Sequence, residues 1–456
     1  MSPFLEILTT IFAVLYVIVR FLISLWWIYI PLFLGALAWS LWIRYIRNKH
    51  VQEMEWILLE IKPPKDIQKI ARAMEQFFAG LHGVAGTPNW WDRNIKGMMQ
   101  RWFSLEIISQ GGEIHFLIRT LLMYRDLVEA HIYAQYPETE ITLVDDYVYS
   151  VPEDIFNEGY DLYGTELMLT KDDAYPIRTY LHFDKDIVLD EHRIDPVASL
   201  LEAMSKIKEG EHIWIQTLIR PIGDKWKEEG DKIRDKLVGR AVKKEQGEIV
   251  KEVIAWKDAG RDVAREVVTG EVSEGSSSSD SKEEKKYLDF MTKIERDIIT
   301  AVEENVSKLG YETIIRYIYF ARKEIFQSTK PTIIGSYKQF NTQHLNGFKE
   351  NGDTKPGIDY WWEFKTIRNA YRRRRILADY RKRDFIQHSK YISYLKPLLF
   401  ERLPIVNWYF FKSKPFVLNI EELASIYHFP AMAVKAPLTP KVEAKKSEPP
   451  IGLPIE

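Results

Sequence analysis

The stretch GIDYWWEFK holds the side chains of this sequence that come nearest to a nuclease metal site. Asp359 and Glu363 could ligate Mg²⁺, and Lys365 could position a water molecule for attack on phosphate. These residues are closer in sequence than the usual two-strand arrangement requires, and a pair of tryptophans more often anchors a segment to a core. We therefore expect no nuclease centre in this stretch.

Other patterns that carry chemistry are missing from the sequence. The chain contains no cysteine, which excludes disulfides, thiolate metal sites and cysteine nucleophiles. No G-x-x-x-x-G-K-[ST] motif occurs, so ATP is not bound through a P-loop. The 10 histidines form neither H-E-x-x-H nor a close pair on a helix face, and no G-x-S-x-G precedes a helix. The sequence predicts a protein that is not an enzyme and has no cofactor or metal ion.

The clearest charge feature is the stretch RNAYRRRRILADYRKRDF, which predicts a basic helix. The 63 Lys and Arg of the chain are balanced by 65 Asp and Glu, so any nucleic-acid site must be a local patch of this kind. Two interpretations are open: the cations contact phosphates of lipid headgroups or DNA, or they pair with carboxylates of the same chain. The residues concerned are Arg368, Arg372, Arg373, Arg374, Arg375, Arg381, Lys382 and Arg383.

The N-terminal part of the sequence predicts a membrane anchor. Residues 4–46 are nearly all apolar, and Phe21 to Ile43 alone supplies the roughly 20 residues that cross a bilayer. Arg20 would be costly at mid-bilayer, so the segment before it lies in the interface or makes a short second leg. Basic residues follow the crossing at once, whereas the first 19 residues contain no Lys or Arg. This asymmetry places the region after residue 50 in the cytoplasm.

The first soluble stretch, residues 51–150, predicts alternating strands and helices. Apolar residues alternate along the strands and recur on one face of the helices, whose ends carry Asp, Gly or Pro signals. The expected elements are a strand at 56–64, a helix at 66–83, a hairpin of strands at 101–109 and 113–120, a helix at 123–137 and a strand at 139–147. The order βαββαβ is that of a ferredoxin-like unit.

A second unit of the same kind is expected over residues 160–330. Its predicted elements are a strand at 175–183, a helix at 195–207, a strand at 211–222, a helix at 289–310 and a strand at 311–322. A charged, low-complexity insertion at 224–288 interrupts it. The predicted fold class is α+β. An N-terminal transmembrane helix (1–50) precedes tandem ferredoxin-like units, the second with a helical and disordered insertion, then a helical and basic region (331–430) and a flexible tail (431–456).

Near the end of the chain, NIEELASIYHFP predicts a short capped helix. Asn419 can cap it, the acidic pair that follows suits the positive helix N-terminus, and Pro430 ends it. Helices of this length are marginal in water, so packing against a partner is the expected source of order. The alternative is that the same face packs on this chain's own second unit. The residues predicted to dock are Glu421, Glu422, Leu423, Ile426, Tyr427 and Phe429.

Several stretches resemble a known family: FSLEIIS, GEIHFLIRT, VEAHIYAQYPETEITLVDDY, FVLNIEELASIYHFP and VEAKKSEPPIGLPIE. They are similar to the membrane-proximal region that precedes the ATPase domain in coupling-type motors of type IV secretion and conjugation, of the HerA–FtsK class. The similarity covers most of residues 50–456. In such relatives the helix and the Lys-Glu-Pro tail lead directly into the motor, whereas here the chain stops. The resemblance therefore implies that a hexameric ATPase is a separate chain.

These observations predict a non-catalytic, membrane-anchored adaptor or scaffold of a DNA-translocating or secretion ATPase machine. The expected location is the cell membrane, and the expected partners are the membrane and the separate ATPase. DNA is a further candidate partner, and a homo-oligomer is compatible with this function. The alternative is a membrane-surface nucleic-acid-binding protein that uses the arginine-rich segment 368–383.

Overall fold

The structure is a computed structural model that describes most of the chain. The residues described are 24–64, 71–152, 154–184, 195–223, 225–237, 292–326, 330–357, 365–385 and 413–430, with positions 13, 16 and 20. Contacts divide the chain into two parts. The anchor part draws on residues 1–56, 86–100 and 384–411, and the sheet part on 57–85, 101–383 and 412–456. Each part is described by itself.

The anchor part contains one long helix, α2 (Trp26–Gln52), and a short helix, α4 (Trp90–Asn94). The 27 residues of α2 span about 40 Å. Its apolar side chains are largely exposed, and within the described residues it is the one helix long and apolar enough to cross a membrane. The predicted apolar helix is thus present as a helix long enough to cross a membrane, and α2 begins at Trp26. The second leg proposed before Arg20 lies almost wholly outside the described residues.

The first half of the sheet follows the predicted order. Its elements are β1 (Trp56–Lys62), α3 (Ala71–Leu81), β2 (Phe103–Gln110), β3 (Glu113–Leu121), α5 (Arg125–Gln135) and β4 (Glu140–Val144). Gly111 and Gly112 join β2 to β3 with φ angles of 60° and 97°, a conformation that glycine adopts without a steric cost. The strands, hairpin and helices predicted for this region are confirmed, within a few residues at their ends.

The second half contains more elements than predicted. They are β5 (Tyr160–Leu169), α6 (Tyr180–Asp184), α7 (Ala198–Ser205), β6 (Glu211–Pro221), α8 (Lys225–Leu237), α11 (Lys293–Ser307), β7 (Gly310–Arg322), α12 (Lys330–Lys338), β8 (Phe348–Glu350), α13 (Lys365–Lys382), β9 (Phe416–Asn419) and α15 (Ile420–Ile426). The predicted helices at 195–207 and 289–310 and strands at 211–222 and 311–322 are confirmed. Residues 238–291, the bulk of the predicted insertion, and the tail 431–456 lie outside the described residues.

The strand predicted at 175–183 is wrong, and the first strand of this half, β5, was missed. Ile177, Tyr180 and Phe183 are buried and lie three residues apart, which is the spacing of one helical turn. The backbone N–H groups of the first two also bond to side chains and not to a neighbouring strand. The N–H of Ile177 donates to Glu422 Oε1 at 2.8 Å, and the N–H of Tyr180 donates to Ser425 Oγ at 2.9 Å.

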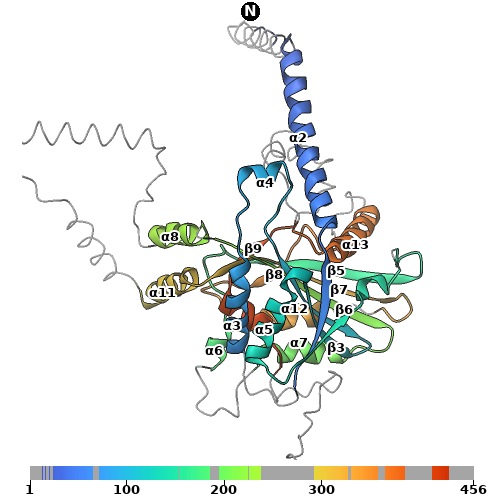
Figure 1. The fold of residues 1–456 in the computed structure, drawn as a ribbon, viewed down its shortest axis with the longest axis vertical. Coiled ribbons are helices and arrows are strands. Elements are labelled where there is room, and N and C mark those ends of the chain that lie inside the picture. Colours follow the sequence, from blue (N-terminus) through green and yellow to red (C-terminus); the bar gives the residue numbers. More distant parts are fainter. Residues whose placement is uncertain are drawn as a thin grey trace, which may run out of the picture. The chain divides into compact units, whose positions relative to one another are not determined.

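The nine strands of the described residues form one sheet in the order β4-β1-β3-β2-β6-β7-β5-β8, and β9 pairs with β7 (Figure 1). The paired strands β2 and β6 join the two halves, with Phe103 opposite Ile219 and Gln110 opposite His212. The sheet is mostly antiparallel, and β5 and β9 share one edge of β7. The structure therefore has a mixed α+β fold, while the division of this sheet into tandem ferredoxin-like units stays a prediction.

Both faces of the central strands are buried. One face packs under α3, α5, α6, α7, α12 and α15, which together with alternate strand residues form a single apolar core. The other face packs under α13, where Ile376 approaches Gly164 of β5 so closely that a Cβ at residue 164 would lie 3.2 Å from Ile376 Cγ2. Side chains that point to either face of β6 and β7 are therefore buried.

We expect replacement of Leu423 by Ala to lower the free energy of unfolding by about 2 to 5 kcal/mol, because this fully buried side chain fills the core between α15 and α3. Ile367→Ala, at a position on α13 that is 68% exposed, is the matched control and should change it by less than about 0.5 kcal/mol. Denaturant unfolding of the full chain in detergent measures both. Equal small effects would contradict the packing of α15.

Candidate functional site

The most polar feature of the described core is a row of four side chains across four neighbouring strands. Glu106 on β2 lies opposite Gln216 on β6, Gln216 lies opposite Arg316 on β7, and Arg316 lies opposite Glu166 on β5. Residues opposite each other on paired strands point to the same face of a sheet. All four therefore face α13, and all are buried.

The members of this polar row are hydrogen-bonded to one another. Arg316 donates from Nε to Glu166 Oε1 at 2.7 Å and from Nη1 to Gln216 Oε1 at 3.2 Å. Gln216 in turn donates from Nε2 to Glu106 Oε1 at 3.3 Å. Buried charges are costly unless they are paired and hydrogen-bonded. Within the row Arg316 pairs with Glu166, whereas Glu106 is neutralised by a cation from outside it.

The C-terminal end of α13 closes over the polar row. Gln216 Nε2 donates to the carbonyl of Tyr380 at 3.0 Å, and Arg316 Nη1 donates to the carbonyl of Asp379 at 3.2 Å. The last carbonyls of a helix have no partner within the helix and carry partial negative charge. Side chains of the sheet thus donate hydrogen bonds to the last carbonyls of the helix that covers them.

Arg383 is the residue that locks this end of α13 to the sheet. It donates from Nε and Nη2 to the two oxygens of Glu106, at 2.6 and 2.9 Å, and from Nη1 to Asp146 Oδ2 at 2.5 Å. Its carbonyl accepts from Trp102 Nε1 at 2.7 Å. Burial alone would lower the pKa of Arg383, but Glu106 and Asp146 outweigh burial and raise it well above the usual value.

The backbone of Arg383 adopts an unfavourable conformation at this position. Its φ is 50°, the one positive φ of a non-glycine residue in the described parts of the chain. Glycine usually occupies this place after a helix, because a Cβ costs roughly 1 to 2 kcal/mol in the left-handed region. The bidentate ion pair with Glu106 supplies the compensating interaction.

Two tyrosines complete the polar cluster around Glu106. Tyr147 donates its hydroxyl to Glu106 Oε2 at 2.8 Å, and the hydroxyls of Tyr147 and Tyr380 lie 2.7 Å apart. Burial, followed by the negative charge of Glu106, raises the pKa of both tyrosines well above the usual value. They are therefore neutral hydrogen-bonding groups and not bases.

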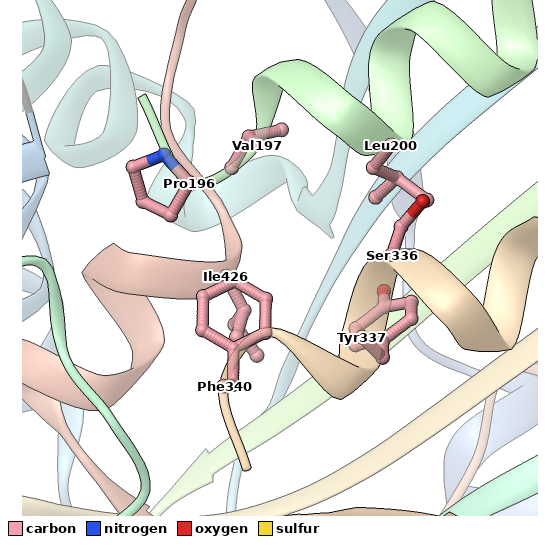
Figure 2. A pocket seen from close by; sticks show the side chains of 7 residues that line it. All are labelled: Pro196, Val197, Leu200, Ser336, Tyr337, Phe340 and Ile426. Carbon is pink, nitrogen blue, oxygen red and sulfur yellow. The ribbon is translucent and has the colours of Figure 1, made fainter. Parts of the chain in front are cut away.

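The charges of the polar row are engaged within the chain. Each charged side chain of the polar row contacts an opposite charge or a carbonyl of the same chain, and no metal-ligand cluster occurs among the described residues. The hollow drawn in Figure 2 lies between α7, α12 and α15, and its lining is almost wholly apolar. It has no room for a water molecule, so it is not a ligand pocket.

Most of the predicted basic residues are used inside this chain. Arg372 is buried and donates from Nη1 to the carbonyls of Gly352 and Lys355, at 3.0 and 2.7 Å. Arg381 donates to two further carbonyls, those of Val151 and Pro152. The remaining pairs join Arg373 to Asp161 and Arg375 to Asp379, and Arg368 is half-buried.

Two of the eight basic side chains are exposed on the described surface of α13. Arg374 has a side chain that is 59% exposed, with a loose 3.6 Å contact to Asp154, and Lys382 is also exposed. The acidic pair Asp359 and Glu363 lies outside the described residues. Most cations of the basic stretch thus have partners within the chain, as the second of the two interpretations expects.

The six residues predicted to dock a partner are all buried in this chain. Leu423, Ile426, Tyr427 and Phe429 belong to the apolar core. Glu421 pairs with Lys308, and Glu422 accepts the backbone N–H groups of Ile177 and Asn419, each at 2.8 Å. Asn419 caps α15 as predicted, in a capping box with Glu422. The order of this helix therefore has a source within the chain, and the docking residues present no exposed face.

The sequence matches a family model described as a domain of unknown function, DUF8128, over residues 47–440. The chain belongs to this family. The DUF8128 match begins within α2 and includes the whole described sheet, the polar row and α15. A comparison with curated proteins finds no match.

Sequence reasoning missed the polar row of the DUF8128 domain. The available signal was a polar residue in the middle of an otherwise apolar strand, as with Glu106 in SLEII, Gln216 in IWIQTLI and Arg316 in TIIRYIYF. The alternation of apolar and polar residues along a strand assigns such a residue to a solvent-exposed face. Only the covering helix shows that this face is buried.

We expect Arg383→Gln to lower the free energy of unfolding by about 3 to 5 kcal/mol, because it leaves Glu106 charged and buried without its partner. Arg374→Gln, on the helix that precedes Arg383, is the matched control and should cost less than about 1 kcal/mol. Thermal and denaturant unfolding of the full chain compare them. A neutral Arg383→Gln would refute the locking role of the ion pair.

Glu422 should make the stability depend on pH. Burial raises its pKa to about 8, although two backbone N–H groups act in the opposite direction. A carboxyl with a raised pKa holds its proton more tightly in the folded chain, so its contribution is full below about pH 4.5 and is lost as the pH rises through about 8.

In Glu422→Gln the side chain stays uncharged, so the free energy of unfolding should fall less steeply between about pH 5 and 8, by up to about 1.4 kcal/mol per pH unit. Unfolding curves of the full chain across this range give the slope. Glu209→Gln, at an exposed position, should keep the slope of the unsubstituted chain. Identical slopes for all three proteins would contradict the raised pKa.

Proposed function

We propose that this DUF8128 protein is a non-catalytic, membrane-anchored scaffold or adaptor of a DNA-translocating ATPase machine of the type IV secretion and conjugation kind. Two features of the chain together carry the proposal. One is α2, an apolar and exposed helix, and the other is a core whose buried charges form ion pairs with one another. A core held together in this way suits a structural role more than a catalytic one. The ATPase partner rests on the family resemblance of the quoted sequence stretches.

Membrane anchoring is supported by the composition and exposure of α2. Trp26 and Trp27 lie near its start and Trp39 and Trp42 near its middle, and all four are exposed. Tryptophans at two levels of a crossing helix are typical of the two membrane interfaces. The basic residues that follow within 44–49 support an orientation in which the sheet part faces the cytoplasm.

We propose further that the sheet consists of two ferredoxin-like units joined edge to edge. The elements β1-α3-β2-β3-α5-β4 pair in the order β4-β1-β3-β2, and β5-α7-β6-β7-α12-β8 give the corresponding order β8-β5-β7-β6. On this assignment α8 and α11 both belong to the insertion between β6 and β7. The antiparallel pairing of β5 with β7 and with β8 supports this assignment, because neighbouring strands of a ferredoxin-like unit run antiparallel.

The alternative, a nucleic-acid-binding protein of the membrane surface, would depend on the exposed cations of α13. Arg374 and Lys382 offer two such charges, and each phosphate contact contributes a similar step to the salt dependence of binding. A weak site of this kind would need further basic residues from a second copy or from a partner.

In cells that make the protein naturally, we expect the tagged full chain to retain an FtsK-class ATPase after crosslinking and purification from solubilised membranes. An unrelated tagged membrane protein is the control, and quantitative mass spectrometry is the measurement. Absence of any P-loop ATPase above the control would contradict the scaffold proposal. DNA recovered in its place, with an affinity that falls with salt and is lost in the Arg374→Gln, Lys382→Gln double variant, would establish the alternative.

A further inference from the structure

We propose that α4 is a second membrane contact, which places Trp90 and Trp91 in the interfacial layer of the bilayer that α2 crosses. The proposal rests on the membrane anchoring described under Proposed function and adds a site to it. Its occupant is a lipid surface that contains anionic headgroups.

The exposure of the two tryptophans is the first observation. Trp90 is 63% and Trp91 is 59% exposed, and their rings lie 6.2 Å apart. The other tryptophans described outside α2 are buried or half-buried. Adjacent exposed indoles are costly in water, whereas the membrane interface suits a ring that is apolar over its face and polar at one N–H.

The second observation is that the turn presenting these rings is well defined. Asn89 accepts the N–H of Asp92 on its side-chain oxygen at 2.9 Å, and Asn94 donates its side-chain amide to the carbonyl of Trp90 at 3.0 Å. The N–H of Ile95 donates to the carbonyl of Trp91, also at 2.9 Å. The short helix α4 at the tip of this loop (Figure 1) is therefore held by its own hydrogen bonds, and both rings are exposed.

The third observation fixes the loop at the level of the membrane boundary. Gly97 has a φ of 71°, and a Cβ there would lie 2.5 Å from the carbonyl oxygen of Ile46. This close backbone approach attaches the loop to α2 just after Ile43, where the predicted crossing ends. Trp91 lies six positions before Gly97 in the sequence, a length of chain that reaches at most about 20 Å. The rings therefore lie within reach of the interface.

The charges around α4 favour lipid over another apolar surface. Arg93 is exposed beside the tryptophans, as is Lys96, which pairs with Asp92. Near the attachment point α2 carries Arg44, Arg47 and Lys49, the last of which lies 3.9 Å from Glu53. Basic residues next to a crossing helix are attracted to anionic headgroups. An aromatic pair with a basic rim is the pattern expected of an interfacial lipid contact.

A single cysteine can test this contact, because the chain has no cysteine of its own. Ile95→Cys lies beside the tryptophans and leaves both in place, so a fluorophore attached there reports their depth. The full chain is reconstituted in phosphatidylcholine vesicles containing phosphatidylglycerol and nitroxide-labelled lipid. We expect strong quenching of the fluorophore at residue 95, and loss of most of it in the Trp90→Ala, Trp91→Ala background.

A reference position separates this inference from the proposed function. Trp42→Cys on α2 should be quenched if α2 crosses the bilayer. Quenching at 42 with none at 95 would overturn the α4 contact alone, whereas no quenching at 42 would overturn the anchoring and the α4 contact together. Energy transfer between fluorophores at residue 95 of different copies, without lipid quenching, would assign α4 to contact between copies and also overturn the inference.

Discussion

The ion pair between Arg383 and Glu106 is the interaction on which the arrangement of the sheet part depends. Glu106 lies in the middle of β2 and faces α13, so it must be neutralised where water cannot reach it. Arg383 reaches it only because the backbone after α13 turns into the left-handed region. The helix end, the sheet face and the Asp146 loop are thereby fixed to one another by a single side chain.

The same constraint explains the fate of the basic stretch. A sheet with both faces buried needs a covering helix on each side, and α13 covers the face that carries the polar row. Arg372, Arg373 and Arg375 are consumed by carbonyls and carboxylates of the same chain. In the sequence this run of arginines suggests nucleic-acid binding. In the fold most of its side chains instead hold α13 in place through contacts within the chain.

The C-terminal segment has a comparable role on the opposite face. β9 extends the edge of β7, and α15 places Leu423 and Tyr427 in the core while Glu422 binds the backbone before α6. A short helix that would be marginal alone is ordered by this burial. If the protein acts with a separate motor, the motor must contact other surfaces than this helix, and the anchor part with its exposed tryptophans would hold the assembly at the membrane.

The sequence by itself determined the elements that local pattern controls: the apolar helix at 26–52, the βαββαβ order of residues 51–150, and the capped helix after Asn419. Each depends on periodicity or on caps, which act within a few residues. Only the tertiary structure decided that Glu106, Gln216, Arg316 and Glu166 form one buried row. The register of strands more than 40 residues apart and the burial of the second face are long-range properties, and no local pattern distinguishes a polar residue under a helix from one in water.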